Sequence, residues 1–172
     1  MKILVFGTWH SETANKFKKQ ANELGKIVAE RGHILIASPS KGIQGLVAKS
    51  YKDNGGTKFI GYYPKLKFMK KIGEEILIEP DRKVMTHKDY PIRNLIQIKK
   101  SDAIIVLTGG TGTLSEVIAT IKDYKMPIGY YKGSSILLDK YFKIDPETNK
   151  EVFQSKNMNK IIDYLEENFK RV

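Results

Sequence analysis

The chain has 172 residues, no cysteine, and 30 Lys and Arg against 19 Asp and Glu, for a formal net charge of +11. This length is typical of one compact domain, and the absence of cysteine excludes disulfides, thiolate metal sites and cysteine nucleophiles. The positive charge favours anionic ligands, but the lysines are dispersed and form no basic and aromatic stripe of the kind that marks a nucleic-acid surface.

No apolar run reaches the length of a membrane span, and the N-terminus lacks the pattern of a signal peptide. The three histidines, His10, His33 and His87, are too scattered to suggest a metal site. We therefore expect a single cytoplasmic domain over residues 1–172, with no membrane contact, no metal ion and no cofactor.

The first half of the chain alternates between strand and helix patterns. Residues 3–6 are apolar throughout, which predicts a strand covered on both faces. Apolar residues then recur at helical spacing, which predicts a helix over residues 11–31 that ends at Gly32. The elements predicted next are a strand over 33–37, a glycine-bearing turn over 41–45, a helix over 46–54 and a strand over 58–62.

The middle of the chain is less regular, with a predicted strand over 75–79 and a turn at Pro80 and Asp81. Asp89 and Pro91 predict the cap and first turn of a helix that runs to about residue 100. The remaining predicted elements are a strand over 103–107, a helix over 113–124, a strand over 127–130, a turn or hairpin tip over 144–152 and a helix over 158–169. This order predicts an α/β fold, a Rossmann-like doubly wound and mostly parallel sheet with helices on both faces.

A glycine-rich segment directly follows the predicted strand over 103–107 and reads Gly-Gly-Thr-Gly-Thr-Leu-Ser-Glu over residues 109–116. A strand, a glycine turn and a helix start place backbone N–H groups where a phosphate binds. We predict phosphate or nucleotide contacts at Gly109, Gly110, Thr111, Gly112 and Thr113.

Two earlier loops belong to the same predicted site. In parallel sheets ligands bind at the carboxyl ends of the strands, so the loops after the first, second and 103–107 strands should line one crevice. We therefore add Gly7 and Thr8 from the first loop, and Gly42 and Gly45 from the second, to the predicted nucleotide-binding residues. For Gly42 and Gly45, tight turning and helix packing are the alternative roles.

The segment 109–116 resembles the P-G-G-x-G-T-x-x-E signature of the LONELY GUY (LOG) phosphoribohydrolases and their relatives, often labelled lysine decarboxylases. The family also has an arginine 16 positions before the first motif glycine, where this chain has Arg93. The resemblance extends to about Tyr131. It implies a Rossmann-like fold, a homodimer, and hydrolysis of nucleoside 5′-monophosphates to free base and ribose 5-phosphate, with Arg93 and Glu116 as catalytic residues.

The chain departs from the family pattern at Thr108, which replaces the motif proline, and at Asn94, which replaces a common lysine. A third departure is the run Ala37-Ser38-Pro39, where the family has glycines. These departures are compatible with nucleotide binding and argue against cytokinin nucleotides as substrates. The chain looks closer to uncharacterised Rossmann-like cousins of the LOG enzymes.

Glu116 has a physical role in such a reaction, because glycosidic cleavage passes through a cationic sugar that an ionised carboxylate stabilises. A position in the first turn of a helix favours the ionised form. The alternative is that Thr113 to Glu116 forms a capping box, in which the glutamate only satisfies a backbone donor. The tetrapeptide alone favours the cap, and the spacing to Arg93 favours the catalytic role.

Two rival functions remain open at this point. The first is a non-catalytic protein that binds a nucleotide or a molybdopterin-type cofactor in the same crevice. The second, ranked below it, is a nucleic-acid binder related to the DNA-processing protein A family. A dinucleotide dehydrogenase is disfavoured because Gly7-Thr8-Trp9-His10, and not Gly-x-Gly-x-x-Gly, follows the first strand.

Overall fold

The structure, a computed structural model, describes residues 1–169, and their strands form one parallel sheet in the order β4-β3-β2-β1-β5-β6-β7. Every neighbouring pair runs parallel. The strands are β1 (Lys2–Gly7), β2 (Ile34–Ala37), β3 (Phe59–Tyr63), β4 (Arg82–Met85), β5 (Ala103–Leu107), β6 (Ile128–Tyr131) and β7 (Val152–Ser155). The predicted Rossmann-like doubly wound fold is confirmed.

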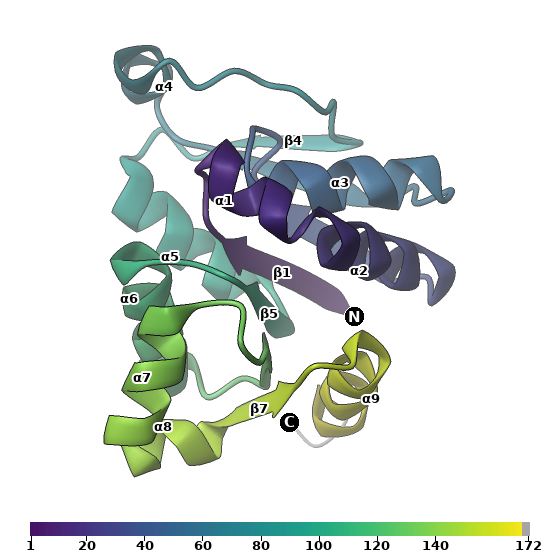
Figure 1. Cartoon of the computed structure of the whole chain (residues 1–172). Helices are drawn as coiled ribbons and strands as arrows, with labels where there is room; N and C mark the ends of the chain where they lie inside the picture. The colour runs from purple at the N-terminus through teal and green to yellow at the C-terminus, as the bar shows by residue number, and fades with distance from the viewer. Residues whose placement is uncertain (170–172) are drawn as a thin grey trace.

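Helices cover both faces of this sheet (Figure 1). On one face lie α2 (Lys18–Glu30), α3 (Ile43–Asp53) and α9 (Met158–Phe169), and on the other lie α5 (Tyr90–Lys100), α6 (Thr111–Ala119) and α7 (Ile136–Ile144). The shorter helices are α1 (Ser11–Lys16), α4 (Leu66–Ile72), α8 (Pro146–Glu151) and the π-helical turn η1 (Thr120–Tyr124). Within residues 1–169, no helix combines the length and apolar character that a membrane crossing requires.

The central strands are apolar because both faces of the sheet are buried there. In β1, Ile3 and Val5 point into the core under α2, α3 and α9, whereas Leu4 and Phe6 point into the core under α5, α6 and α7. All four side chains are at most 1% exposed. A strand buried on both faces has no polar alternation, which is why the continuous apolar run correctly predicts it.

The position of the candidate site follows from the strand order. β1 pairs with β2 on one side and with β5 on the other, so the crossovers run in opposite directions from the middle of the sheet. Such a switch point leaves a crevice beyond the carboxyl ends of the strands. The loops after β1, β2 and β5 meet there.

Three predicted helices differ from the structure at their ends. The predicted helix over 11–31 is two helices, α1 and α2, because Phe17 leaves the helical region at φ −113° and ψ 19°. The predicted helix over 46–54 begins earlier, with Gly42 as the N-cap of α3. The predicted helix over 113–124 begins at Thr111 and changes into η1 after Ala119.

Two predictions about the edges of the sheet are wrong. Residues 75–79 are not a strand, because the N–H groups of Leu77 and Ile78 both donate to the carbonyl of Pro39. The strand at this edge, next to β3, is β4, and its largely exposed residues carry no apolar pattern. Residues 144–152 are not a hairpin tip, because the Asp145 carboxylate accepts from the N–H groups of Glu147 and Thr148 and thereby caps α8, which leads into β7.

Candidate functional site

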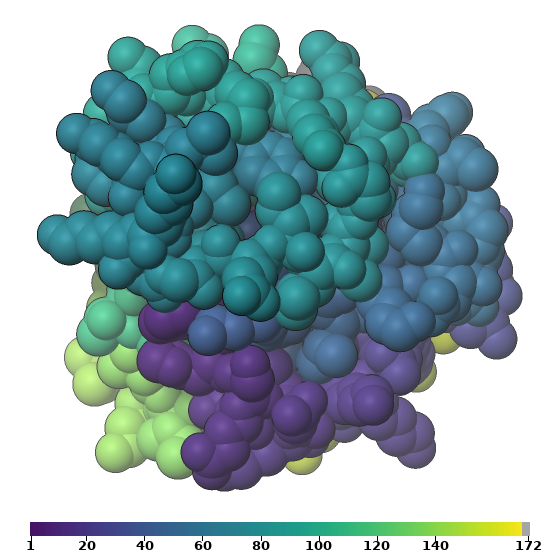
Figure 2. Space-filling model, turned by 90° about the horizontal axis from the view of Figure 1, so that it is seen from above, coloured from purple at the N-terminus to yellow at the C-terminus, as the bar shows by residue number. Residues whose placement is uncertain are grey.

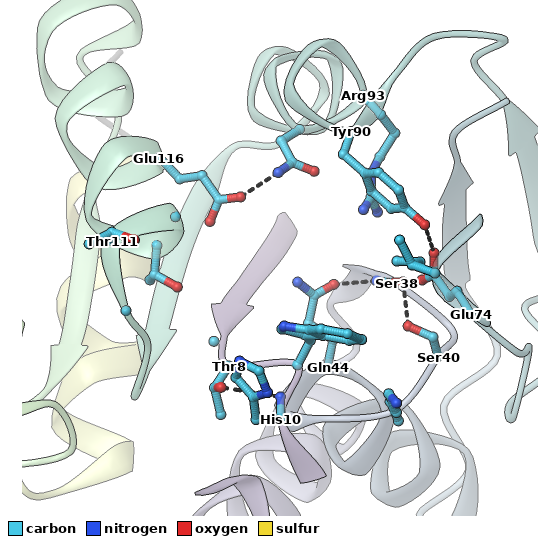
Figure 3. Close-up of a pocket in the computed structure, with 18 residues that line it drawn as sticks. Thr8, His10, Ser38, Ser40, Gln44, Glu74, Tyr90, Arg93, Thr111 and Glu116 are labelled. Carbon is cyan, nitrogen blue, oxygen red and sulfur yellow. Dashed lines mark hydrogen bonds between the residues drawn. The ribbon is translucent and has the colours of Figure 1, made fainter. Parts of the chain in front are cut away.

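A cavity of about 410 Å³ opens at the carboxyl ends of β1, β2 and β5. Its walls come from the loops after these strands, from the first two turns of α5 and α6, and from the end of α4. Eight predicted site residues line it, namely Gly7, Thr8, Arg93, Gly110, Thr111, Gly112, Thr113 and Glu116. In Figure 3 the labelled side chains surround an open centre, with Glu116 and Thr111 facing Glu74 and Tyr90 across it. The predicted crevice between the three loops is therefore present.

Three predicted residues, Gly42, Gly45 and Gly109, do not line this cavity. Gly42 has φ 87°, and a Cβ there would lie 2.4 Å from the carbonyl oxygen of Thr8. A Cβ at Gly45 would lie 1.9 Å from the carbonyl oxygen of Ser40. Both glycines therefore let the loops that carry Thr8 and Ser40 pack against α3.

The first turn of α6 presents its backbone to the cavity. Gly110 is the N-cap of α6, and a Cβ at Gly110 or at Gly112 would meet no atom within 4 Å. The first N–H groups of a helix have no partner within the helix, so they are free to bind an anion. Residues 110–113 all line the cavity, so a ligand bound there lies beside this helix N-terminus.

Two serines that no sequence motif marks support this turn. The N–H group of Thr108 donates to the Ser134 Oγ at 2.8 Å, and the Ser135 Oγ donates to the carbonyl of Gly109 at 2.8 Å. Thr108 itself has φ 58°, a strained conformation for a residue with a Cβ. The serines hold the strained turn at the start of the glycine-rich segment.

Glu116 lies in the second turn of α6, so the capping-box alternative is wrong. Thr113 is the third residue of the helix, and the Glu116 carboxylate accepts a hydrogen bond from the Nδ2 of Asn94 on α5. Figure 3 shows this carboxylate turned toward the cavity. The Asn94 amide occupies the position where the LOG pattern has a lysine, so a neutral donor faces Glu116.

The charge state of Glu116 differs from the sequence prediction. Burial raises the pKa of Glu116 to about 7, although the Arg93 guanidinium and the Asn94 hydrogen bond act in the opposite direction. A position in the first turn would have favoured ionisation, but in the second turn desolvation outweighs the helix dipole. Glu116 therefore exchanges a proton near neutral pH.

Arg93 is 6% exposed and lies one helical turn after Tyr90. Its Nη1 donates to the carbonyl of Tyr62 at 3.2 Å, and its guanidinium carbon lies 5.4 Å from the centre of the Tyr90 ring. Within residues 1–169 the buried Nε has no hydrogen-bond partner. Burial lowers the pKa of Arg93, while the carboxylates of Glu74 and Glu116 oppose this shift. The guanidinium therefore keeps unused donors near the cavity.

The far side of the cavity holds a polar group that sequence reasoning missed. The Glu74 Oε1 accepts from the Ser38 Oγ at 3.1 Å, and the Glu74 Oε2 accepts from the Tyr90 hydroxyl. The Ser38 N–H donates to the Oε1 of Gln44. Tyr90 has a recognisable signal, because it stands three residues before Arg93 on one helix face. Glu74 has none, since it follows α4 in an irregular segment.

The histidines do not gather at this site. His10 lines the cavity beside Trp9, whereas His33 is buried against the Glu166 carboxylate on α9. Among the residues that the structure describes, no group of three His, Asp or Glu side chains is arranged to hold a metal ion.

A model of the SLOG cluster4 family matches residues 1–162. The chain belongs to this family. One relative is an uncharacterized protein of Archaeoglobus fulgidus, 33% identical over 125 residues, which are 73% of this chain and 76% of that protein. A probable cytokinin riboside 5′-monophosphate phosphoribohydrolase of Arabidopsis thaliana is 30% identical over 144 residues, which are 76% of this chain and 69% of that protein.

A solved structure shows the same fold in another protein. The Moco carrier protein of Chlamydomonas reinhardtii aligns with a TM-score of 0.78 at 24% identity, over 99% of this SLOG cluster4 chain and 98% of that chain. The predicted resemblance to the LOG group is confirmed.

The raised pKa of Glu116 predicts a pH-dependent stability. In the unfolded chain this carboxyl has a pKa near 4.5, against about 7 in the folded protein, so ionisation disfavours the folded state. Relative to wild type, Glu116→Gln is expected to gain stability as pH rises from 4.5 to about 7, with a constant difference above that. Thermal unfolding of both proteins across this range measures the gain.

The matched control for this prediction is Glu147→Gln, since Glu147 is an exposed glutamate on α8. Because Glu147 is exposed, its variant should show no gain in stability over wild type as pH rises. A difference between Glu116→Gln and wild type that does not grow with pH would contradict the raised pKa of Glu116.

Proposed function

We propose that the protein hydrolyses the N-glycosidic bond of a nucleoside 5′-monophosphate and releases free base and ribose 5-phosphate. The observation that carries this proposal is the convergence of Arg93, Glu116 and the α6 N-terminus on one cavity. A relative named as a phosphoribohydrolase supports the same class of reaction.

The phosphate would bind the N–H groups at the start of α6, at residues 110–113. The Thr8 Oγ1 accepts a hydrogen bond from the N–H of His10, so its own hydroxyl hydrogen remains for a phosphate oxygen. The formal charge of +11 attracts such an anion from solution. With the phosphate there, the ribose lies beside the second turn of α6, where Glu116 projects.

In the reaction the bond between C1′ and the base nitrogen breaks, and its electron pair leaves with the base. Ionised Glu116 stabilises the positive charge that develops on the sugar. A water oxygen forms the new bond to C1′ and passes one proton to Glu116. The departing base takes up one proton from solvent, and Glu116 then releases its proton to solvent. The unused N–H donors of Arg93 suit the ribose hydroxyls, and its charge favours the ionised form of Glu116.

The test is incubation of the protein with a panel of nucleoside 5′-monophosphates, followed by chromatography of the products. We expect one monophosphate to give base and ribose 5-phosphate in equal amounts. The corresponding nucleoside, which lacks the phosphate, should react far more slowly because it cannot use the α6 N-terminus. Tight binding with no base release from any member of the panel would instead favour a non-catalytic nucleotide or cofactor carrier.

The same proposal includes a homodimer and a single domain over residues 1–172 in the cytoplasm. The homodimer is proposed from the LOG resemblance. The cytoplasmic location is proposed from the sequence composition. Nucleic acid is not a proposed ligand, because the basic residues are dispersed.

A further inference from the structure

We propose that Glu74 selects the base of the ligand, and that the selected base presents a ring N–H beside an exocyclic amino group, as guanine does. This inference rests on the proposed function and names its substrate class. Glu74 belongs to the connection between α4 and β4, outside the glycine-rich motif and the loops after β1 and β2.

The sheet order places Glu74 and its partners at the base end of a bound nucleotide. The phosphate-binding turn follows β5, whereas Ser38 follows β2, and β1 lies between these strands. Two strand spacings correspond to about 10 Å, which is comparable with the reach from phosphate to base edge in a nucleotide. Figure 3 shows Glu74 across the cavity from Thr111, near Ser38 and Tyr90.

The surface around Glu74 comes from a segment that extends away from the sheet. Figure 1 shows α4 apart from the main body, with a long connection from it to β4. Figure 2 shows the molecule from above the view of Figure 1, and the blue-green surface of α4 and the residues that follow it covers much of the face seen there. Ile72 and Glu74 are the residues of this segment that reach the cavity.

The hydrogen bonds at Glu74 leave it able to accept two more. The Ser38 Oγ occupies one lone pair of Oε1, and the Tyr90 hydroxyl occupies one lone pair of Oε2. One lone pair therefore remains on each oxygen, and a carboxylate with both oxygens available accepts two parallel N–H bonds. No Lys or Arg among residues 1–169 forms an ion pair with Glu74. The Arg93 guanidinium acts on Glu74 only through space, so both carboxylate oxygens keep a free lone pair for a ligand.

The two side chains that donate hydrogen bonds to Glu74, Ser38 and Tyr90, hold its carboxylate in place. Burial and the neighbouring carboxylate raise the pKa of the Tyr90 phenol, so Tyr90 keeps its proton and remains a donor. Ser38 is 7% exposed and its Oγ also lies 2.9 Å from the Ser40 Oγ. The carboxylate is therefore held in one orientation at the wall of the cavity, which favours selective recognition.

Guanine matches this acceptor pair, because its N1–H and its 2-amino group are adjacent donors. Hypoxanthine keeps the N1–H but lacks the amino group. Adenine places an acceptor nitrogen beside its amino group, so it offers one N–H and one repulsive lone pair. A pterin carries the same edge as guanine. The expected order of affinity is therefore GMP, then IMP, then AMP.

The experiment is calorimetric titration of wild type, Glu74→Gln and the neighbouring control Glu75→Gln with GMP, IMP and AMP. Wild type is expected to bind GMP roughly 10- to 100-fold more tightly than IMP, because IMP lacks one charge-assisted hydrogen bond. In Glu74→Gln the ratio of the two dissociation constants should fall toward one, since an amide offers one acceptor oxygen. Glu75 is exposed, and its variant should keep the wild-type ratio.

A purely structural role for Glu74 would weaken all three ligands equally, and this result would overturn the inference. Glu74→Asp, which keeps the charge but withdraws the carboxylate, is the second variant and should also lose the GMP preference. Neopterin monophosphate is the fourth probe. If it binds more tightly than GMP, and if Glu74→Gln weakens it in the same way, then recognition of a ring N–H beside an amino group is confirmed and the preferred ligand is a pterin.

Base release distinguishes this inference from the proposed function. Selective binding of GMP without hydrolysis would support the role of Glu74 and contradict the hydrolase. Hydrolysis of AMP with a kcat/KM equal to or above that of GMP would overturn the role of Glu74 and support the hydrolase.

Discussion

Glu116→Gln is expected to lower kcat for base release by about 10²- to 10³-fold and to change the dissociation constant of the nucleotide by less than about threefold. The amide cannot take a proton from water and carries no charge to stabilise the sugar cation. It keeps the shape of the side chain, and its carbonyl oxygen still accepts the Asn94 hydrogen bond. The phosphate contacts at residues 110–113 do not involve this side chain.

The measurements are single-turnover base release and calorimetric binding of the same nucleotide, with Glu147→Gln as the control that should match wild type. Because the reaction uses ionised Glu116, kcat/KM of the wild type should rise with pH and level off above the Glu116 pKa of about 7. A kcat within threefold of wild type for Glu116→Gln would show that this carboxylate is not the catalytic group.

Arg93→Met is expected to lower kcat/KM by about 10²-fold or more while leaving the unfolding temperature unchanged or higher. Burial lowers the pKa of Arg93, which means that the folded protein disfavours its charge, and the Nε lacks a partner. Methionine fills a similar volume without that desolvation cost. Activity falls because the ribose donors are lost and the pKa of Glu116 moves further above 7.

Thermal unfolding and steady-state kinetics test this pair of effects together. Arg82→Met is the control, since Arg82 is exposed on the edge strand β4, and its kcat/KM should equal that of wild type. A fall in unfolding temperature of more than about 5 °C for Arg93→Met would indicate that Arg93 is a structural residue. An unchanged kcat/KM for Arg93→Met would show that Arg93 does not contribute to the reaction.

The sequence predicts the elements whose structure depends on local features. The apolar runs of β1 and β5 identify strands buried on both faces, and the Asp89 carboxylate does cap α5 by accepting from the N–H of Ile92. The sequence does not predict the elements whose structure depends on partners distant in the chain. The exposed strand β4 exists because of its pairing with β3, and the apolar residues Leu77 and Ile78 lie in a loop whose N–H groups donate to the Pro39 carbonyl.

For the candidate site, the sequence alone determined the glycine-rich turn after β5 and the spacing of Arg93 from it, because both are properties of consecutive or regularly spaced residues. Packing between α5 and α6 brought Asn94 to Glu116 and partly desolvated the carboxylate, which raised its pKa instead of lowering it as expected. The irregular segment after α4 supplied Glu74 to the opposite wall. Only the tertiary structure decided these features, because desolvation and long-range hydrogen bonds depend on residues that are far apart in the chain.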